Sequence, residues 1–479
     1  MIREEARPKF TTQFRYEIPV EYDASMKVPA VVYGDQGSVD SAWKDGSINQ
    51  LVNVATLPSI VKAAYAMPDI HGGYGFPIGG VAAFDYDSGI VSPGGVGYDI
   101  NCGVSLYTIP VDAREFMVKR KAVVDGIFKK VPSGLGNSAS KSISMTDLGR
   151  ILDEGLEWAV GKGMALDGDL ERTEERGHLP QADASRVSGS ARQRGKNQVG
   201  TLGAGNHFLE VQRVREIHDR QIAGSFGIGQ EDQIVVMIHT GSRGLGHQIA
   251  TDYLKEISSS PRDEKLKDEQ LMHTPIHDRV GSRYIAAMAA GANFGFVNRA
   301  VIGWRVRETF RETFGIPADE VKLVYSLAHN IAKIEDHMVD GHRRKLMVHR
   351  KGATRALPRG LAENPFRETG HPVLVPGDMG TGSCLLVGEP ASMDLSFGSS
   401  CHGAGRLLSR HASLRKFTEH EVMSGLERAG VYTRFSSKKV LLEEAPGSYK
   451  DLERVVEITV RSGLAKKVAS FSPLGVVKG

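Results

Sequence analysis

The first candidate for chemistry is His402, which stands between a cysteine and a glycine in the segment SFGSSCHGAGRLLSR. The glycines predict a turn, and residues 403–429 predict a long helix whose N-terminus would face the imidazole. Free N–H groups and the positive end of the helix dipole attract phosphate at such a position. A neutral imidazole there could attack phosphorus as a nucleophile or only bind the phosphate, and the motif leaves both open.

Five other side chains are of the types that bind transition metals. Asp99 and Cys102 share a glycine-rich loop, His207 follows another, and His239 and His329 each end an apolar run that predicts a buried strand. One carboxylate, one thiolate and three imidazoles exclude a pure Mg²⁺ site and favour Mn²⁺, Zn²⁺, Co²⁺ or Fe²⁺. Because five ligands exceed one tetrahedral zinc, we favour two metals that share Cys102. A core cysteine and histidines that only hydrogen-bond at strand ends are the alternative.

Two further segments are candidates for nucleotide and phosphate binding. The loop 376–383 (PGDMGTGS) lacks the Lys-Ser/Thr ending of a P-loop. Its Asp378 could accept hydrogen bonds from guanine, although a tight turn would explain the same residues. Segment 341–360 holds seven Lys or Arg and no acid, so it is either a patch for a polyanion or a solvated surface. Within it, Lys351 lacks the Asp-Gly that follows the nucleophilic lysine of classical nucleotidyl ligases, and we assign it to phosphate binding.

The elements that must position these residues are short buried strands and helices separated by glycine clusters. Catalytic groups often lie on loops that such strands hold in place. The chain shows no repeat and no sharp change in composition, so we predict one large α+β domain over 1–479. The polar segment 164–198 is either a mobile lid or a surface loop. The expected strands lie at 235–239, 323–326 and 372–376, and the expected helices at 113–130, 146–162, 277–314 and 403–429.

Composition limits the class of protein. The net charge of +3 means that any polyanion must be bound by a local patch. Three cysteines in 479 residues are too few for a disulfide framework, which favours a reducing compartment. The charged N-terminus and the lack of an apolar run of about 20 residues predict a soluble, cytoplasmic protein with no membrane partner.

Nine segments together resemble the RtcB-type RNA-splicing ligases over essentially the whole chain. Long motifs in one order are specific evidence, unlike any single short motif. The segments are PDIHGGYGFPIGG, GGVGYDINCGV, GTLGAGNHFLE, HTGSRGLG, SLAHN, RKGATRA, PGDMGTGS, SSCHGAGR and the terminal VKG. The family fold is a single α+β domain of its own type, which agrees with the absence of a domain boundary.

The resemblance implies a specific reaction. Such enzymes join an RNA end with a 2′,3′-cyclic phosphate or 3′-phosphate to a 5′-hydroxyl end, with GTP and two Mn²⁺ ions. His402 would take GMP from GTP and release pyrophosphate, GMP would pass to the RNA 3′-phosphate, and the 5′-hydroxyl would displace it. A cyclic phosphate would first be opened by hydrolysis. The transfer RNA splicing and RNA repair roles of the family, and an archease-type activator, are further expectations, as is a monomeric state.

The resemblance also implies residue roles. One manganese would be held by Asp99, Cys102 and His207, and the other by Cys102, His239 and His329. Asp378 departs from family members that carry serine, so its contact to the base is expected in a different form. RNA and phosphate contacts are expected from Arg194, Arg243 and Lys351. The implied GTP contacts are Asn206, His207, Phe208, Leu209, Glu210, His329, Asn330, Pro376, Gly377, Asp378, Met379, Ser383, His402, Gly403, Ala404, Gly405, Arg406, Tyr449 and Lys478.

Two other functions compete with the ligase. A dinuclear metallophosphoesterase would use the same five ligands on cyclic phosphates without a nucleotide. A non-catalytic RNA-binding protein would use only the basic segment 341–360. Covalent labelling of the protein by GTP distinguishes the RNA ligase from both of these alternatives.

Overall fold

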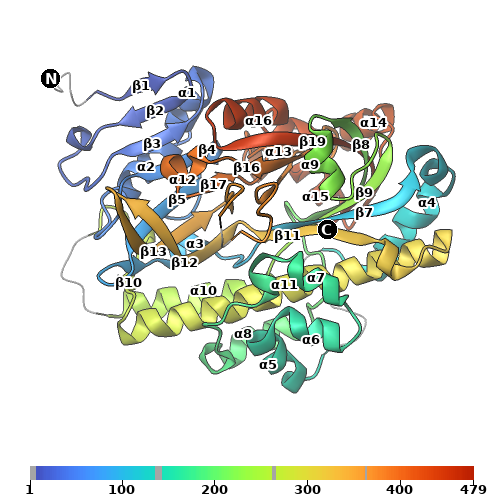
Figure 1. Cartoon of the computed structure of the whole chain (residues 1–479), viewed down its shortest axis with the longest axis horizontal. Coiled ribbons are helices and arrows are strands. Elements are labelled where there is room, and N and C mark those ends of the chain that lie inside the picture. Colours follow the sequence, from blue (N-terminus) through green and yellow to red (C-terminus); the bar gives the residue numbers. More distant parts are fainter. Residues whose placement is uncertain (1–6, 135–142, 261–265, 362–363) are drawn as a thin grey trace.

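Two β-sheets lie side by side in the computed structural model, which describes residues 7–134, 143–260, 266–361 and 364–479 (Figure 1). The first sheet has the order β1-β2-β3-β4-β5-β13-β12. Its strands are β1 Lys9–Thr12, β2 Arg15–Ile18, β3 Ala30–Tyr33, β4 Ala64–His71, β5 Ile78–Asp85, β12 Asn330–Val339 and β13 His342–Lys351. Only β3 and β4 pair in parallel within it.

The second sheet has the order β11-β7-β9-β8-β19-β16-β15, with β18 parallel to β19. Its strands are β7 Gly103–Asp112, β8 Phe208–Ile217, β9 Gln233–Thr240, β11 Lys322–Ala328, β15 Pro372–Pro376, β16 Ser383–Gly388, β18 Tyr432–Phe435 and β19 Ala465–Lys478. Two short ribbons complete the strands: β6 Ile90–Val91 with β10 Thr274–Pro275, and β14 Ala353–Arg355 with β17 Ser399–Cys401. The three expected strands lie within β9, β11 and β15.

Helices pack against both sheets (Figure 1), and mixed helices and sheets make the fold α+β, as expected. The expected helix at 113–130 is α4, which begins where the Asp112 carboxylate accepts a hydrogen bond from the Glu115 N–H. The expected helix at 146–162 is divided at Gly155, whose φ of 60° is left-handed. The longer helices are α1 Gln36–Lys44, α2 Ser47–Val54, α4 Ala113–Lys130, α5 Met145–Glu154, α10 Arg243–Ser258, α11 Arg279–Phe314, α14 Glu419–Arg428 and α16 Leu452–Arg461. The shorter ones are α3 Pro93–Val96, α6 Leu156–Gly161, α7 Asp167–Glu171, α8 Gly189–Gly195, α9 Arg220–Ser225, α12 Ala391–Ser396, α13 Arg410–Lys416 and α15 Lys438–Glu443.

The predicted helix at 403–429 is wrong. Helix α13 begins only after Ser409 and α14 after Thr418, and both residues cap the helix that follows with their hydroxyls. Between His402 and α13 the chain turns, with Gly405 at a left-handed φ of 76°. A Cβ at Gly405 would lie 2.4 Å from the Asp69 carbonyl oxygen, so the turn needs glycine to approach β4. His402 therefore does not face a helix N-terminus.

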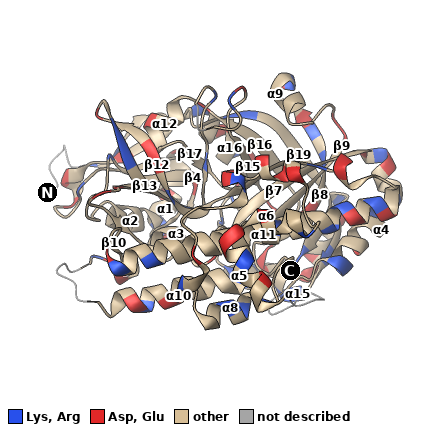
Figure 2. Ribbon diagram, turned by 60° about the horizontal axis from the view of Figure 1, so that its bottom comes forward, with Lys and Arg blue, Asp and Glu red and all other residues tan. Residues whose placement is uncertain are grey.

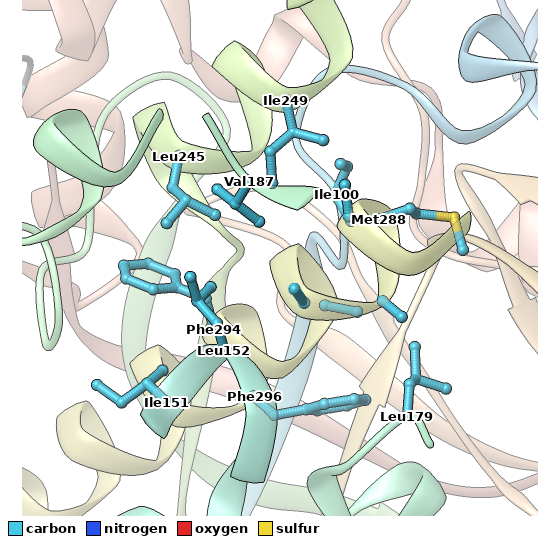
Figure 3. Close-up of a cluster of buried hydrophobic side chains, with 14 of the residues drawn as sticks. Ile100, Ile151, Leu152, Leu179, Val187, Leu245, Ile249, Met288, Phe294 and Phe296 are labelled. Atoms are coloured by element: carbon cyan, nitrogen blue, oxygen red, sulfur yellow. The ribbon is translucent and has the colours of Figure 1, made fainter. Parts of the chain in front are cut away.

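The long helix α11 runs along the molecule, with α5 and α6 packed on it (Figure 1), and contributes side chains to two of the buried clusters. An 18-residue window has a mean hydropathy of 1.3, enough to cross a membrane by composition, but 94% of that window is buried inside the structure. From the sequence we expected no such apolar stretch, and this expectation was wrong. In the structure the apolar side chains of this helix pack in the core. Phe294 and Phe296 of α11 belong to one buried cluster with Ile249 and Ile100 (Figure 3). Because Ile100 follows Asp99, this core also anchors the predicted metal loop.

Segment 164–198 contains the helices α7 and α8 and two short 3-10 turns, Glu174–Gly177 and Ala184–Arg186. Val187 and Ala191 belong to the core cluster around α11, and Glu174 is buried in an ion pair with Lys333 of β12. These contacts attach the segment to the body of the fold. A lid function for it, like the single-domain organisation over 1–479, stays a prediction.

Candidate active site

The five predicted metal ligands come together at one edge of the second sheet, because the register of four adjacent strands brings their ends side by side. Cys102 precedes β7, whose first residues pair with the last residues of β9 and β11. His239 pairs with Val104 on one side and with Phe208 on the other. His329 directly follows β11, and its N–H donates to the Cys102 carbonyl at 2.9 Å.

The ligand atoms form two groups that share the Cys102 sulfur: Asp99, Cys102 and His207, and Cys102, His239 and His329. The sulfur lies 3.5 Å from the Nε2 atom of His207 and 3.3 Å from that of His239. The Nε2 atoms of His239 and His329 are 3.3 Å apart. Tetrahedral ligands at metal–ligand distances of about 2.0–2.3 Å are separated by roughly 3.3–3.8 Å, so these spacings fit shared ions.

Electrostatics of the cluster also fits a metal site. Burial lowers the pKa of His239 and His329 well below the ordinary value, which keeps both imidazoles in the neutral form that binds metals. Their Nδ1 atoms are buried and have no hydrogen-bond partner among the described residues, while their Nε2 atoms face each other. Burial, with Asp99 beside it, raises the pKa of the Cys102 thiol, and a bound cation would have to displace its proton. The donor set suits Mn²⁺, Zn²⁺, Co²⁺ or Fe²⁺.

Arg299 of α11 holds in place the loops that carry the predicted metal ligands. It is fully buried and donates to the backbone carbonyls of Asn101 at 2.8 Å and Thr240 at 2.9 Å. The β9 end can approach the loop because residue 241 is glycine: a Cβ there would lie 2.7 Å from the Cys102 Cα. Asn101 itself has a left-handed φ of 52°, a strained conformation that the arginine contacts stabilise.

His402 directly follows β17 of the β14–β17 ribbon and faces the metal cluster. Its ring centroid is 4.8 Å from that of His329. Its Nδ1 lies 2.6 Å from the Oδ2 atom of Asp69, which also accepts the backbone N–H of His402 at 3.0 Å and of Gly403 at 3.3 Å. Asp69 is fully buried; burial alone would raise the pKa of its carboxyl, but the charge and hydrogen bonds of His402 hold it below the ordinary value. The ionised carboxylate fixes the Nδ1–H tautomer and leaves Nε2 for a ligand.

A cavity of about 400 Å³ between the two sheets joins His402 to the metal cluster. This size suits a nucleotide. Most residues expected to bind metal or GTP line it: Asp99, Cys102, Asn206, Phe208, Glu210, His239, His329, Asn330, Pro376, Gly377, Met379, His402, Gly403, Ala404, Gly405, Arg406, Tyr449 and Lys478. Lys351 also lines it; burial lowers its pKa to about 7, and its Nζ donates to the carbonyls of Tyr74 and Phe76.

One part of the cavity is positively charged around a buried carboxylate. Glu444 is fully buried, and Arg406 donates to it at 3.0 Å while the Lys478 Nζ lies 3.6 Å away. Arg410 also lies 3.6 Å from this carboxylate. Burial would raise the pKa of Glu444, but the charges of Lys478 and Arg406 lower it, so it stays ionised. Three cations around one anion leave an excess of positive charge, which suits phosphate groups.

Some predicted residues do not line this cavity. Leu209 alternates with Phe208 and Glu210 along β8, so its side chain packs in the opposite core cluster. The Asp378 carboxylate accepts the N–H groups of Gly380 and Thr381 and closes a tight turn, the alternative reading of that loop.

Three other predicted residues act on the site through neighbours or lie at its margin. The Ser383 hydroxyl donates to Gln212, whose amide donates to Glu210. The Arg243 backbone N–H donates to the Asp99 carboxylate at 3.1 Å. Arg194 is exposed on α8 and donates to Gln248.

The basic segment 341–360 is not a free polyanion patch. Arg350 is buried against Glu335, Arg355 pairs with Glu174 and Glu175, and Arg344 pairs with Asp85. In Figure 2 blue and red segments lie next to each other at the β12–β13 hairpin. Because four of its five arginines pair with carboxylates within the fold, the structure disfavours this segment as a free RNA-binding patch.

Two residues of the candidate site were missed by sequence reasoning. Asp69 had a usable signal: a carboxylate inside the apolar run AYAMPDIH must be buried and therefore needs a partner. Glu444 had none, since its partners Arg406 and Lys478 lie far from it in the sequence.

The fold and this site define a known class of protein. Residues 50–479 match the family described as "tRNA-splicing ligase RtcB". Proteins of that name are similar over their full length: one from Thermococcus kodakarensis is 47% identical over 100% of both chains, and one from Pyrobaculum aerophilum is 48% identical over 97% of both. One from Archaeoglobus fulgidus is 47% identical over 98% of both. The chain belongs to the RtcB family, a family of RNA ligases.

Replacing Cys102 tests whether the two ligand groups share one sulfur. Cys102→Ser is expected to lower the occupancy of both ions, because a hydroxyl is a poor replacement for a bridging thiolate. Metal content is measured after loading with Mn²⁺ and gel filtration. Cys384→Ser, another buried cysteine outside the cluster, is the matched control. Loss of only one ion would contradict the bridging assignment.

Proposed function

We propose that this chain is a GTP-dependent RNA ligase that joins 2′,3′-cyclic phosphate or 3′-phosphate ends to 5′-hydroxyl ends through a covalent guanylate on His402. Membership of the RtcB family supports RNA ligation in transfer RNA splicing, and a role in RNA repair is part of the proposal. The single observation that carries the nucleotide chemistry is the His402–Asp69 pair, which aims one imidazole nitrogen into a cavity lined by metal ligands and cations.

The covalent step follows from the tautomer. With Nδ1–H donated to Asp69, the Nε2 lone pair of His402 attacks the α-phosphorus of GTP, a P–N bond forms and pyrophosphate leaves. An oxygen of the RNA 3′-phosphate then attacks the same phosphorus, and the P–N bond breaks. Finally the 5′-hydroxyl attacks the activated RNA phosphorus and GMP leaves. Hydrolysis opens a cyclic phosphate before these steps.

Positively charged side chains of this chain would bind the phosphates of the nucleotide and of the RNA. Arg406 and Lys478 stand at the buried Glu444, and Lys351 lies on the cavity wall. They would offset the repulsion between nucleotide and RNA phosphates. Two Mn²⁺ ions, held by Asp99, Cys102 and His207 and by Cys102, His239 and His329, would supply further positive charge at the reacting phosphates.

The guanine base fits Glu210 better than Asp378. Glu210 is buried, lines the cavity and already accepts a hydrogen bond from Gln212, whereas the Asp378 carboxylate is used by its own turn. A carboxylate can accept the N1–H and the exocyclic amine of guanine, and adenine lacks that pattern. Lys478 lies over the Phe208 ring at 5.7 Å, next to this position.

Incubation with α-labelled GTP and Mn²⁺ tests the proposal. We expect a covalent guanylate adduct that is labile to acid and stable to alkali, as for a P–N bond, and its transfer to RNA with a 3′-phosphate. If no metal gives an adduct but 2′,3′-cyclic phosphates are hydrolysed, the dinuclear phosphoesterase is the correct reading instead. Label that survives acid would place the bond on an oxygen and contradict the histidine mechanism.

Glu210 should make GTP binding pH-dependent. Burial raises the pKa of Glu210 to about 7, so the carboxylate that accepts from guanine is lost as the pH falls below that value. Without metal, the GTP affinity of the wild type relative to that of Glu210→Gln is expected to rise between about pH 6 and about pH 8, approaching roughly tenfold per unit on the acid side. The ratio is used because Lys351, whose pKa is also about 7, loses its charge over the same range in both proteins. Equilibrium binding of GTP measures it.

Two variants control this measurement. Glu210→Gln should remove the rise and weaken binding at about pH 8, which leaves only the decrease that the loss of charge at Lys351 causes. Asp378→Asn, whose carboxylate faces its own turn, should leave the profile as in the wild type. An unchanged profile in Glu210→Gln would assign the titration to another group.

A further inference from the structure

Three aromatic side chains gather at the edge of the cavity, beside the metal loop. The rings of Tyr98 and His247 are stacked, with centroids 4.8 Å apart and planes at 25°. Tyr74 meets Tyr98 edge to face at 5.3 Å. Tyr74 and Tyr98 line the cavity, and Tyr98 directly precedes the metal ligand Asp99. The three rings thus form one aromatic surface that reaches from the cavity toward solvent.

The three rings remain partly open to solvent although they contact one another. His247 is exposed on α10, and Tyr74 and Tyr98 are partly exposed. By contrast, residues 92–97, which directly precede Tyr98, are buried. Aromatic rings in a core are normally covered, since each buries a large apolar area. A partly open aromatic surface next to a reaction centre is suited to receive a flat ligand.

Charge beside the rings indicates which flat ligand this is. Arg194 is exposed and donates to Gln248, the residue after His247. Aromatic faces next to a cation that can bind phosphate are the means by which proteins hold unpaired nucleotides. The guanine of GTP has a separate place at Glu210 in the proposed function. The remaining flat ligand of an RNA ligase is a base of the RNA itself.

We propose that Tyr74, Tyr98 and His247 form a stacking platform for the base at an RNA end, with Arg194 beside the adjoining phosphate. The platform rests on the RNA-ligase function and does not depend on the guanylate step. It holds the terminal nucleotide so that its phosphate or hydroxyl reaches the metal cluster. Stacking accepts every base, so the platform positions an end without selecting its sequence.

RNA binding by variants tests the platform. Tyr98→Leu and Tyr74→Leu are each expected to raise the dissociation constant for a short single-stranded RNA by about 5- to 100-fold at fixed salt. Tyr98→Phe keeps the ring and should restore binding to within about twofold, as expected for stacking. Tyr86→Leu is the matched control, because Tyr86 packs edge to face on His277 away from this cavity. Thermal unfolding and metal content check that each variant is folded.

Abasic RNAs identify the end that stacks. One RNA lacks the base of the 3′-phosphate nucleotide, and the other lacks the base of the 5′-hydroxyl nucleotide. The wild type should lose affinity for one of them, and Tyr98→Leu should lose nothing more on that RNA, since ring and base act as a pair. Equal losses on intact and abasic RNA, or weaker GTP binding with RNA binding unchanged, would overturn the platform. The adduct assay reports separately on the guanylate step, so failure of either proposal is recognised by itself.

Discussion

His402→Ala is expected to abolish both the guanylate adduct and RNA joining, with a loss of at least about 10⁴-fold, because the Nε2 atom that is proposed to bond to phosphorus is removed. The five metal ligands do not include His402, so the variant should still bind metal. Adduct formation is measured with labelled GTP in a single turnover, and metal content by elemental analysis. His411→Ala, exposed on α13, is the matched control and should label like the wild type.

Two outcomes would contradict this assignment. Labelling at the wild-type rate in His402→Ala would move the nucleophile to another residue. An adduct that forms normally in the variant but is not passed to RNA would make His402 a phosphate-binding residue, the alternative that the sequence motif left open. Peptide mapping of the labelled wild-type protein locates the bond directly.

The metal ligands could be predicted from the sequence because the ends of buried strands can be recognised from the ends of apolar runs. His239 and His329 end apolar runs, and residues at the ends of buried strands are exposed to a common edge of the sheet. What the sequence could not give was the order of strands, β11-β7-β9-β8, that brings Cys102 between the two histidines. Pairing between segments far apart in the chain has no local signal.

The error at 403–429 has a related cause. Helical propensity after Gly405 is real, and two helices do form, but the turn before them is decided by the tertiary contact of Gly405 with Asp69. The predicted contact between Asp378 and guanine has a similar explanation. The pattern Asp-x-Gly-Thr is compatible with both a ligand-binding loop and a tight turn. Only the hydrogen bonds to Gly380 and Thr381 distinguish them.

Asp69→Asn is expected to slow guanylate formation by about 10²- to 10⁴-fold with little change in the KM for GTP. When the Nε2 atom of His402 bonds to phosphorus, the imidazole becomes positively charged, and the buried carboxylate 2.6 Å from Nδ1 stabilises that charge. An amide keeps the volume and can accept one N–H, but it carries no charge and can favour the wrong tautomer.

The pH dependence gives this prediction a second readout. The pKa of Asp69 lies below the ordinary value, so the wild-type carboxylate is ionised throughout the neutral range and is lost only on acidification through its lowered pKa. Single-turnover rates of Asp69→Asn should therefore stay low at every neutral pH. Asp85→Asn, which removes a surface pairing with Arg344 at the end of β5, is the matched control. A wild-type rate in Asp69→Asn would mean that the charge of the carboxylate takes no part in the step, and that Asp69 only holds the 402–403 turn through its backbone hydrogen bonds.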